Sequence, residues 1–300
     1  MIYYQINEKG EVVRSDGKTP SESEVEYALS VNVPPSYSDV RIYKQPNRLF
    51  FTALDSGGKR QYLYTEEWNK KAENLKFKGV KSLANDYEKL RKLLVKNLGS
   101  ESLTKRDTAS ILLIIMECGL RIGEDRYEKQ NESFGVSTIK KKHVCIEKET
   151  VKLEFVGKKG VINYCAFKNK KIRDYLQQKI DGIKKEDRVF EVHPVTVNRF
   201  LRTLGPYRAK TIRTLKANIL FLKNLRRGVE KNGDYKKSEL KKIVNTALDE
   251  TAFTLNNTKS VCKKKYIYSQ FINEFLEQFE LFRKKLFKYN DLDFLKKFLP

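Results

Sequence analysis

Hydrophobic positions follow two different periods in the two ends of the chain. Near the start, polar and apolar residues alternate through residues 40–43, 49–52 and 61–64, and alternation is the pattern of half-buried strands. The turn sequence Asp55-Ser-Gly-Gly58 lies between the last two segments. From Tyr87 onward, apolar residues recur every three or four positions instead. The pattern therefore predicts a small β-rich part followed by a larger, mainly helical part.

The larger part is expected to begin with two helices. The first covers residues 87–98, and the second covers residues 104–118 and ends at Gly119. A two-stranded hairpin follows within residues 151–165, with the turn sequence Gly-Lys-Lys-Gly at its middle. Helices then continue to the end of the chain, including one over residues 209–227. We therefore expect an α+β fold whose larger, helical domain carries one inserted hairpin.

Positive charge is concentrated in the larger part. The chain holds 61 Lys and Arg against 38 Asp and Glu, a net charge of +23, which indicates a polyanionic partner. Residues 1–75 hold 10 basic and 11 acidic residues, net −1, which leaves 51 against 27, net +24, for residues 76–300. We therefore expect two domains, residues 1–76 and 77–300, with a Lys- and Asn-rich linker over residues 68–83.

Several classes of protein are disfavoured by what the sequence lacks. The longest apolar run, residues 111–116, is far shorter than the roughly 20 residues that span a bilayer, and the start lacks a secretory signal. We therefore expect a soluble, intracellular protein without a membrane partner. The four cysteines form no C-x-x-C pair and there are two histidines, so neither a zinc site nor a disulfide framework is expected. Without a phosphate-binding loop, a carboxylate cluster or a G-x-S-x-G motif, catalysis by tyrosine and cations remains.

Three motifs carry residues suited to that chemistry. They are Cys118-Gly-Leu-Arg-Ile-Gly-Glu124, Lys210-Thr-Ile-Arg-Thr214 and Leu255-Asn-Asn-Thr-Lys-Ser-Val-Cys-Lys-Lys-Lys-Tyr-Ile-Tyr268. Together they resemble the active-site set of the type IB DNA topoisomerases, above all the compact, poxvirus-like members. The resemblance extends to residues 127–136, to Phe155-Val-Gly-Lys158, and to residues 33–43 and 55–64 in the first part. Because the matches keep their order across both parts, the resemblance implies the helical catalytic domain that this family shares with tyrosine recombinases.

The resemblance implies a role for each matched residue. Tyr266 would be the nucleophile, and Lys158 would be the general acid. Arg121 and Arg213 would hold the scissile phosphate. Asn257 matches a fourth phosphate-contacting position that is often His in the family, and Asn keeps a neutral hydrogen-bond donor there while it loses the imidazolium charge. Further DNA contacts are expected from Lys59, Arg60, Gln61, Tyr62, Tyr64, Tyr127 and Lys210.

The implied activity is relaxation of supercoiled double-stranded DNA without ATP, metal or any other cofactor. Attack by a phenolate on a phosphodiester builds negative charge that guanidinium groups can stabilise, and a lysine can protonate the leaving 5′ oxygen. The 3′-phosphotyrosyl intermediate keeps the bond energy, so the strand can rotate and be resealed. The resemblance also implies a monomer. The uneven charge of the two parts predicts a clamp on DNA, with the β-rich domain opposite the helical one. If the protein is viral, the virion and the site of viral DNA replication or transcription are its expected locations.

Alternatives stay open for several residues and for the function. Arg121 follows a helix end, where a cation complements the dipole, and Arg213 could be an exposed charge on a basic helix. Tyr268 competes with Tyr266 as nucleophile, and Lys159 competes with Lys158 as acid. A tyrosine recombinase is the nearest alternative function, although Lys210 stands where recombinases usually carry His. A DNA-binding protein without catalysis is the alternative from another class.

Overall fold

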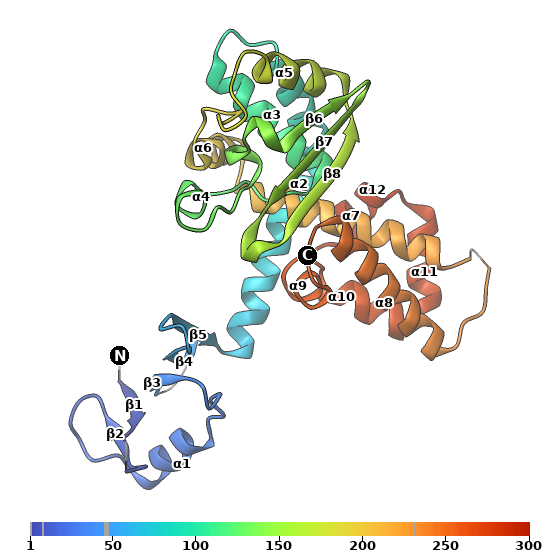
Figure 1. Cartoon of the computed structure of the whole chain (residues 1–300). Helices are drawn as coiled ribbons and strands as arrows, with labels where there is room; N and C mark the ends of the chain where they lie inside the picture. The colour runs from blue at the N-terminus through green and yellow to red at the C-terminus, as the bar shows by residue number, and fades with distance from the viewer. Residues whose placement is uncertain (1, 8, 45–47, 231) are drawn as a thin grey trace. The chain divides into compact units, whose positions relative to one another are not determined.

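The computed structural model describes residues 2–7, 9–44, 48–230 and 232–300. These residues form a mixed helical and β structure that divides into two compact units, residues 1–75 (unit 1) and 76–300 (unit 2). Figure 1 shows the elements of each unit in chain order. Helix α2 (Glu66–Asn97) contributes residues to both units. None of the helices formed by the described residues is long and apolar enough to span a bilayer.

Unit 1 contains an antiparallel sheet with the strand order β2-β1-β3-β4-β5. Its strands are β1 (Tyr3–Ile6), β2 (Val12–Arg14), β3 (Ser38–Tyr43), β4 (Leu49–Leu54) and β5 (Arg60–Tyr64). Tyr4, Ile42 and Phe51 from the sheet form a small core with Ala28 of helix α1 (Glu22–Ser30). The alternation in the sequence predicts β3, β4 and β5, and all three are present.

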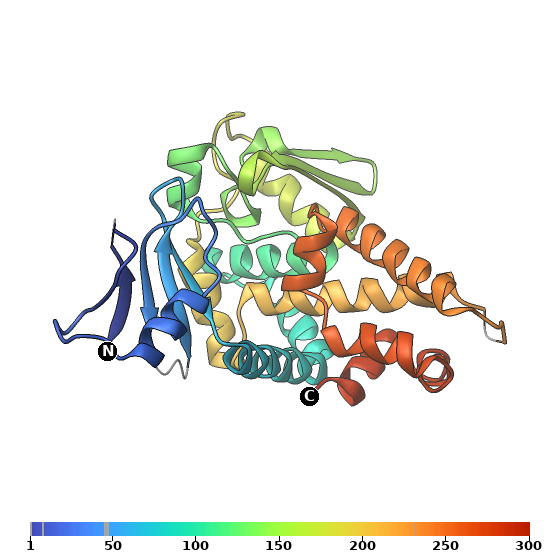
Figure 2. The ribbon, with the colours of Figure 1, turned by 90° about the horizontal axis from the view of Figure 1, so that it is seen from below.

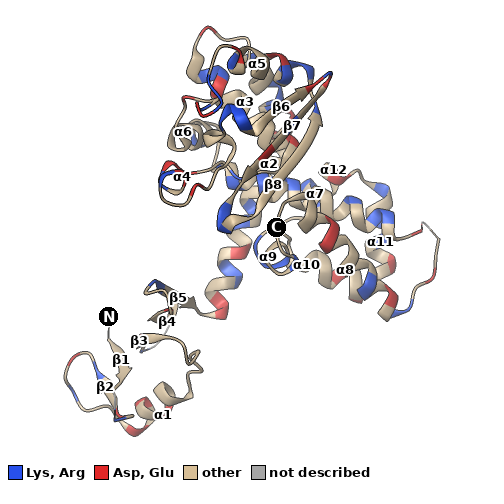
Figure 3. Cartoon of the chain, in the orientation of Figure 1, with Lys and Arg blue, Asp and Glu red and all other residues tan. Residues whose placement is uncertain are grey.

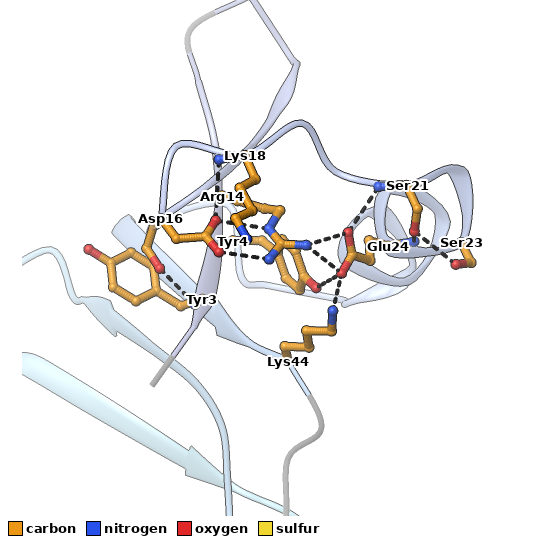
Figure 4. A network of polar contacts seen from close by, with 10 residues as sticks. Tyr3, Tyr4, Arg14, Asp16, Lys18, Ser21, Ser23, Glu24 and Lys44 are labelled. Atoms are coloured by element: carbon orange, nitrogen blue, oxygen red, sulfur yellow. Dashed lines mark hydrogen bonds and ion pairs between the residues drawn. The ribbon is translucent and has the colours of Figure 1, made fainter.

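A network of polar groups around Glu24 ties helix α1 to the sheet (Figure 4). The carboxylate accepts hydrogen bonds from the Tyr4 hydroxyl at 2.9 Å and from Arg14 at 3.0 Å, and it also pairs with Lys44. It closes the capping box of α1 by accepting from the Ser21 N–H at 2.9 Å. The Lys44 ammonium and then the Ser21 N–H hold the pKa of Glu24 far below its usual range. One carboxylate thus joins strands β1 and β2 and the segment after β3 to the start of α1.

Unit 2 is built around helix α3 (Leu103–Cys118), whose residues 107–116 are all buried. A helix that is buried on every side needs partners all round it, and α7 (Ala209–Gly228) packs beside it (Figures 1 and 2). Gly119 ends α3 with a φ of 64° and donates its N–H to the Ile115 carbonyl, as the sequence predicts. The other helices are α4 (Asp125–Asn131), α5 (Lys170–Ile180), α6 (Pro194–Leu204), α8 (Lys237–Thr254), α9 (Lys259–Lys265), α10 (Ser269–Glu277), α11 (Phe279–Lys288) and α12 (Asp291–Phe298).

Two segments of the chain are more regular than the sequence pattern predicts. Residues 68–83, expected to be a linker, belong to the continuous helix α2, because Phe77, Val80 and Leu83 form a buried stripe at helical spacing. The expected two-stranded hairpin is part of a three-stranded sheet, in the order β6-β7-β8. Its strands are β6 (Val144–Glu147), β7 (Thr150–Val156) and β8 (Ile162–Lys168). The four-residue β6 is too short to stand out as an alternating pattern.

The expectation of no disulfide is wrong at one place. Cys118 and Cys165 are joined by a disulfide, although 47 positions separate them in the sequence. The reason is tertiary, because the end of α3 packs against β8. A search for locally spaced cysteine pairs cannot find such a bond.

We expect the Glu24 network to make unit 1 sensitive to acid. A depressed carboxyl pKa contributes stability that is complete above the unfolded-state value, about 4.3 for Glu, and is lost as the pH falls through the folded-state value. Glu24→Gln should therefore speed hydrogen exchange of amides in residues 2–44 at pH 7, and should weaken the acid dependence of that exchange. Glu26→Gln, an exposed change on the same helix, is the control. Equal exchange in both variants would contradict the network's importance.

Candidate active site

Several segments of unit 2 meet around a pocket of about 330 Å³. They come from the stretch after α3, from α4, from the turn before β8, from the first two turns of α7 and from the residue that follows α9. The pocket's lining includes Arg121, Tyr127, Lys158, Lys210, Arg213 and Tyr266. The structure thus gathers, in one place, residues that the sequence analysis selected from motifs far apart in the chain.

Arg213 is buried, which excludes its interpretation as an ordinary surface charge. It lies in the first two turns of α7, and its side chain has only 2% of its surface exposed. One Nη donates to the Gly119 carbonyl, and the other donates to the Leu255 carbonyl at 2.7 Å. Its Nε has no hydrogen-bond partner among the described residues. Burial lowers the pKa of the guanidinium to about 10, so the group is still charged at neutral pH.

Arg121 is presented by a tightly packed loop after α3. Its carbonyl accepts from the N–H of Val136 at 2.9 Å, at the start of the 3-10 turn η1 (Val136–Thr138). Beside it, the backbones of Gly123 and Gly135 touch so closely that a Cβ on Gly135 would lie 2.3 Å from the Gly123 nitrogen. Gly123 also has a φ of +98°, which favours glycine. These contacts fix the loop from which the Arg121 side chain extends.

Arg121 and Asn257 form a pair. The guanidinium Nη2 donates to the Asn257 Oδ1 at 2.6 Å. Because arginine can only donate, the amide oxygen must face it, and the amide nitrogen is left over. That Nδ2 is buried and has no partner among the residues that the structure describes. An orphaned buried donor on a residue bonded to an arginine is suited to an anionic ligand.

The Tyr266 hydroxyl lies in a strongly positive environment. The Arg213 guanidinium carbon is 4.9 Å from the centre of the Tyr266 ring, and the ring is almost fully buried. Burial alone would raise the pKa of the phenol. The charges of Arg213, Arg121 and Lys210 outweigh it, so the pKa of Tyr266 is lowered. The site therefore raises the fraction of phenolate, which is the reactive form of a tyrosine nucleophile.

Asn218 is a site residue that the sequence analysis missed. It is fully buried on α7, donates to the Tyr266 carbonyl at 2.8 Å and accepts from the Tyr268 N–H at 3.1 Å. The sequence feature that could have indicated Asn218 is a polar residue on the apolar side of a helix, five positions after Arg213. Tyr268 is absent from the pocket lining, and its ring packs against Phe77 and Phe271 at 4.7 and 5.1 Å between centroids.

The two lysines of the β7–β8 turn differ in position. Both belong to the 3-10 turn η3 (Lys158–Gly160), and both are exposed. Lys158 lines the pocket, whereas Lys159 is not among the lining residues. Lys159 has the left-handed φ of 64° that turns the chain. The turn therefore presents Lys158 to the site.

The remaining predicted DNA contacts fall on two elements. Tyr127 on α4 lines the pocket, and its hydroxyl accepts from Arg126 at 2.8 Å. On β5 of unit 1, alternation places Arg60 and Tyr62 on one face and Gln61 on the other. The side chains of Arg60 and Gln61 bond to Asp39 and Asp55, respectively. Lys59 and Tyr64 border these residues, and Tyr62 has 56% of its surface exposed.

Lys and Arg occur along most elements of unit 2, including α9 just before Tyr266 (Figure 3). Residues 263–265 are three consecutive lysines on that helix. Phosphate groups approaching unit 2 would therefore meet an excess of positive charge, in addition to the cations that line the pocket.

Comparison with known proteins identifies the family. Residues 65–291 match the model of the eukaryotic DNA topoisomerase I catalytic core. DNA topoisomerase 1B of Acanthamoeba polyphaga mimivirus is 27% identical over 285 residues, covering 89% of this chain and 82% of the relative. DNA topoisomerase 1B of Vaccinia virus (strain Copenhagen) is 26% identical over 246 residues, covering 79% and 77%. DNA topoisomerase 1 of Rabbit fibroma virus (strain Kasza) is 25% identical over 245 residues, again covering 79% and 77%.

The family match spans well over half of the chain and includes the whole pocket. All three relatives are viral, and those of mimivirus and Vaccinia virus are named as type 1B, which agrees with the poxvirus-like character of the motifs. The resemblance found in the sequence is thus confirmed, and the chain belongs to the type IB DNA topoisomerase family.

Proposed function

We propose that this protein relaxes supercoiled double-stranded DNA by transient cleavage of one strand, without ATP or metal. The observation that carries the proposal is the pairing of a buried, charged Arg213 with Tyr266 in a pocket that Lys158 also lines. The protein would act as a type IB topoisomerase, like its named viral relatives. Because the named relatives are viral, the proposed locations are the virion and the places where viral DNA is copied or transcribed.

The first step is attack by Tyr266. The positive groups around the hydroxyl lower the pKa of the phenol and so raise the fraction of phenolate at neutral pH. The phenolate oxygen forms a bond to the scissile phosphorus, and the bond from phosphorus to the 5′ oxygen breaks. The product is a 3′-phosphotyrosyl linkage and a free 5′ end.

Three groups are proposed to hold the phosphate during this step. Arg213 uses two of its five donors on carbonyl groups, so its free Nε and the remaining Nη hydrogens can meet a non-bridging oxygen. Arg121 offers a second guanidinium. The unpartnered Nδ2 of Asn257, oriented by Arg121, supplies a neutral donor where many family members use His. Fixed donors of this kind stabilise the charge that develops in the transition state.

Lys158 is proposed to give its proton to the leaving 5′ oxygen. Its exposed position on a turn would let it enter a groove of the duplex, next to the phosphate that Arg121 and Arg213 hold. An alkoxide is a very poor leaving group, so this proton transfer should contribute about 10²- to 10⁴-fold to the rate. The same lysine would take the proton back when the 5′ hydroxyl reseals the strand.

DNA is proposed to be held by both units. Phosphate contacts from the basic unit 2 would supply most of the affinity. Tyr127 and Lys210 would contact DNA near the pocket, and β5 would place Tyr62 and its neighbours against the duplex. We propose a monomer in which unit 1 closes as the second jaw of a clamp, which leaves the cleaved strand free to rotate.

The direct test of this function uses supercoiled plasmid with chelator and without ATP. The wild-type protein should yield relaxed circles, whereas a protein that only binds DNA should yield retarded supercoiled bands. Denaturing gels of end-labelled duplex should show the protein joined to a 3′ end. A 5′ linkage would contradict the type IB assignment.

Tyr266→Phe should abolish cleavage while the fold and the affinity for DNA remain, because the change removes one oxygen and keeps the ring. Tyr268→Phe is the matched control, since its ring packs in the core and should keep doing so. Covalent adducts on end-labelled duplex provide the measurement. If Tyr266→Phe still forms the adduct and Tyr268→Phe does not, the nucleophile is Tyr268.

Arg213→Lys should slow single-turnover cleavage by about 10²- to 10³-fold with little change in noncovalent binding. A single ammonium cannot bond two carbonyl groups and a phosphate at once. Arg226→Lys is the control, because Arg226 lies on the same helix and also donates to carbonyl groups, those of Leu286 and Tyr289, without lining the pocket. Similar rates for the two variants would show that Arg213 only anchors its helix.

Lys158→Ala should slow cleavage by about 10²- to 10⁴-fold on normal DNA. A substrate with sulfur in place of the bridging 5′ oxygen has a thiolate leaving group, with a pKa of about 8.5 for a free thiol, that needs little protonation. The variant should cleave this substrate at nearly the wild-type rate, while Lys159→Ala should behave like wild type on both. If sulfur instead restores Lys159→Ala and leaves Lys158→Ala slow, Lys159 is the acid.

A further inference from the structure

Strand β8, which follows the Lys158 turn, has one edge that no other strand of the described residues covers. In the sheet of described residues the order is β6-β7-β8, so β8 pairs with β7 on one side only. The backbone N–H and C=O groups on its outer edge therefore need other partners. Tyr164 lies on this strand, opposite Glu154 of β7.

The side chain of Asn256 occupies that edge. Its Oδ1 accepts from the Tyr164 N–H at 3.3 Å, and its Nδ2 approaches the Tyr164 carbonyl at 3.4 Å. A side-chain amide has one acceptor and one donor side, like a peptide group. Asn256 thus pairs with Tyr164 as a residue of a neighbouring strand would.

Asn256 lies between residues that serve the nucleophile side of the site. The preceding Leu255 carbonyl accepts from Arg213, and the following Asn257 accepts from Arg121. Helix α9 and Tyr266 come directly after this loop. Asn256 itself has a φ of 51°, a left-handed conformation that Asn tolerates better than most residues.

A series of hydrogen bonds and close contacts connects Tyr164 to Lys158. The next residue on the strand, Asn163, is buried and donates to the Val161 carbonyl at 2.9 Å. It also packs so tightly on Gly157 that a Cβ there would lie 2.1 Å from the Asn163 Nδ2. The Gly157 N–H donates to Val161 at 2.8 Å and closes the turn. A displacement of the strand edge would therefore be passed on to the Lys158 backbone.

We propose that Asn256 is a positioning residue that sets the Lys158 turn in register with the loop of Arg213, Asn257 and Tyr266. The inference rests on the proposed function and adds to it a link between the acid and the nucleophile sides of the site. Tyr266 attacks one side of the phosphorus while Lys158 protonates the oxygen that leaves from the other side. Both side chains must therefore be correctly placed at the same time. Misplacement of a reacting group by about 1 Å can cost roughly 100-fold in rate.

The test compares Asn256→Gly with Thr254→Ala. Glycine accepts the positive φ of residue 256 and removes both contacts to Tyr164, so the loop itself should remain. Thr254→Ala removes a hydrogen bond within α8, to the Glu250 carbonyl, and serves as the control close in the chain. Asn256→Gly should speed hydrogen exchange of the Tyr164 amide and slow single-turnover cleavage of normal DNA by roughly 10- to 100-fold. The control should do neither.

Two further readouts separate positioning of the acid from a general loss of structure. Sulfur at the bridging position should restore Asn256→Gly to within about threefold of wild type, because Lys158 is then dispensable. Adding Asn256→Gly to Lys158→Ala should slow cleavage of normal DNA no further. The inference would be overturned if Asn256→Gly slowed cleavage of both substrates equally, or if its effect added to that of Lys158→Ala. Unchanged hydrogen exchange of the Tyr164 amide in Asn256→Gly would overturn it as well. Failure of sulfur to restore Lys158→Ala would instead show that the acid assignment of the proposed function is wrong.

Discussion

The site depends on the hydrogen bonds that the buried guanidinium of Arg213 donates to two backbone carbonyl groups. Its two Nη atoms bond to the carbonyl groups of Gly119 and Leu255, which lie 136 positions apart in the chain. Gly119 ends α3 and leads to Arg121, and Leu255 leads to Asn257 and α9. One side chain on α7 therefore joins the backbones that carry the other arginine, the amide and the nucleophile.

A buried cation is expensive unless its surroundings compensate it. Here the compensation comes from two carbonyl dipoles and the face of the Tyr266 ring, and no carboxylate of the described residues pairs with Arg213. A carboxylate would stabilise the arginine better, but it would also neutralise the field that lowers the pKa of Tyr266 and would repel a phosphate. Burial lowers the pKa of Arg213 only to about 10, so the charge survives at neutral pH.

The family resemblance selected Tyr266, Arg213 and Lys158 from motifs in separate segments, and all three line one pocket. Their catalytic roles stay predictions. The burial of Arg213, the Asn218 bridge and the Cys118–Cys165 bond could not be found in this way, because each depends on segments that meet only in the tertiary structure. The start of α2 was missed for a different reason. Its many lysines obscured a buried stripe of Phe77, Val80 and Leu83.

The start of α7 shows why the charges of the site favour the DNA-bound state over the free state. The first turn of the helix contains no acidic residue and carries Lys210, with Arg213 in the next turn. Cations at the positive end of a helix dipole are unfavourable when nothing opposes them, and anions are favourable there. The free protein thus holds positive charge that its own side chains do not neutralise. Carboxylates within the site would remove the field that lowers the pKa of Tyr266 and would weaken the attraction for a phosphate.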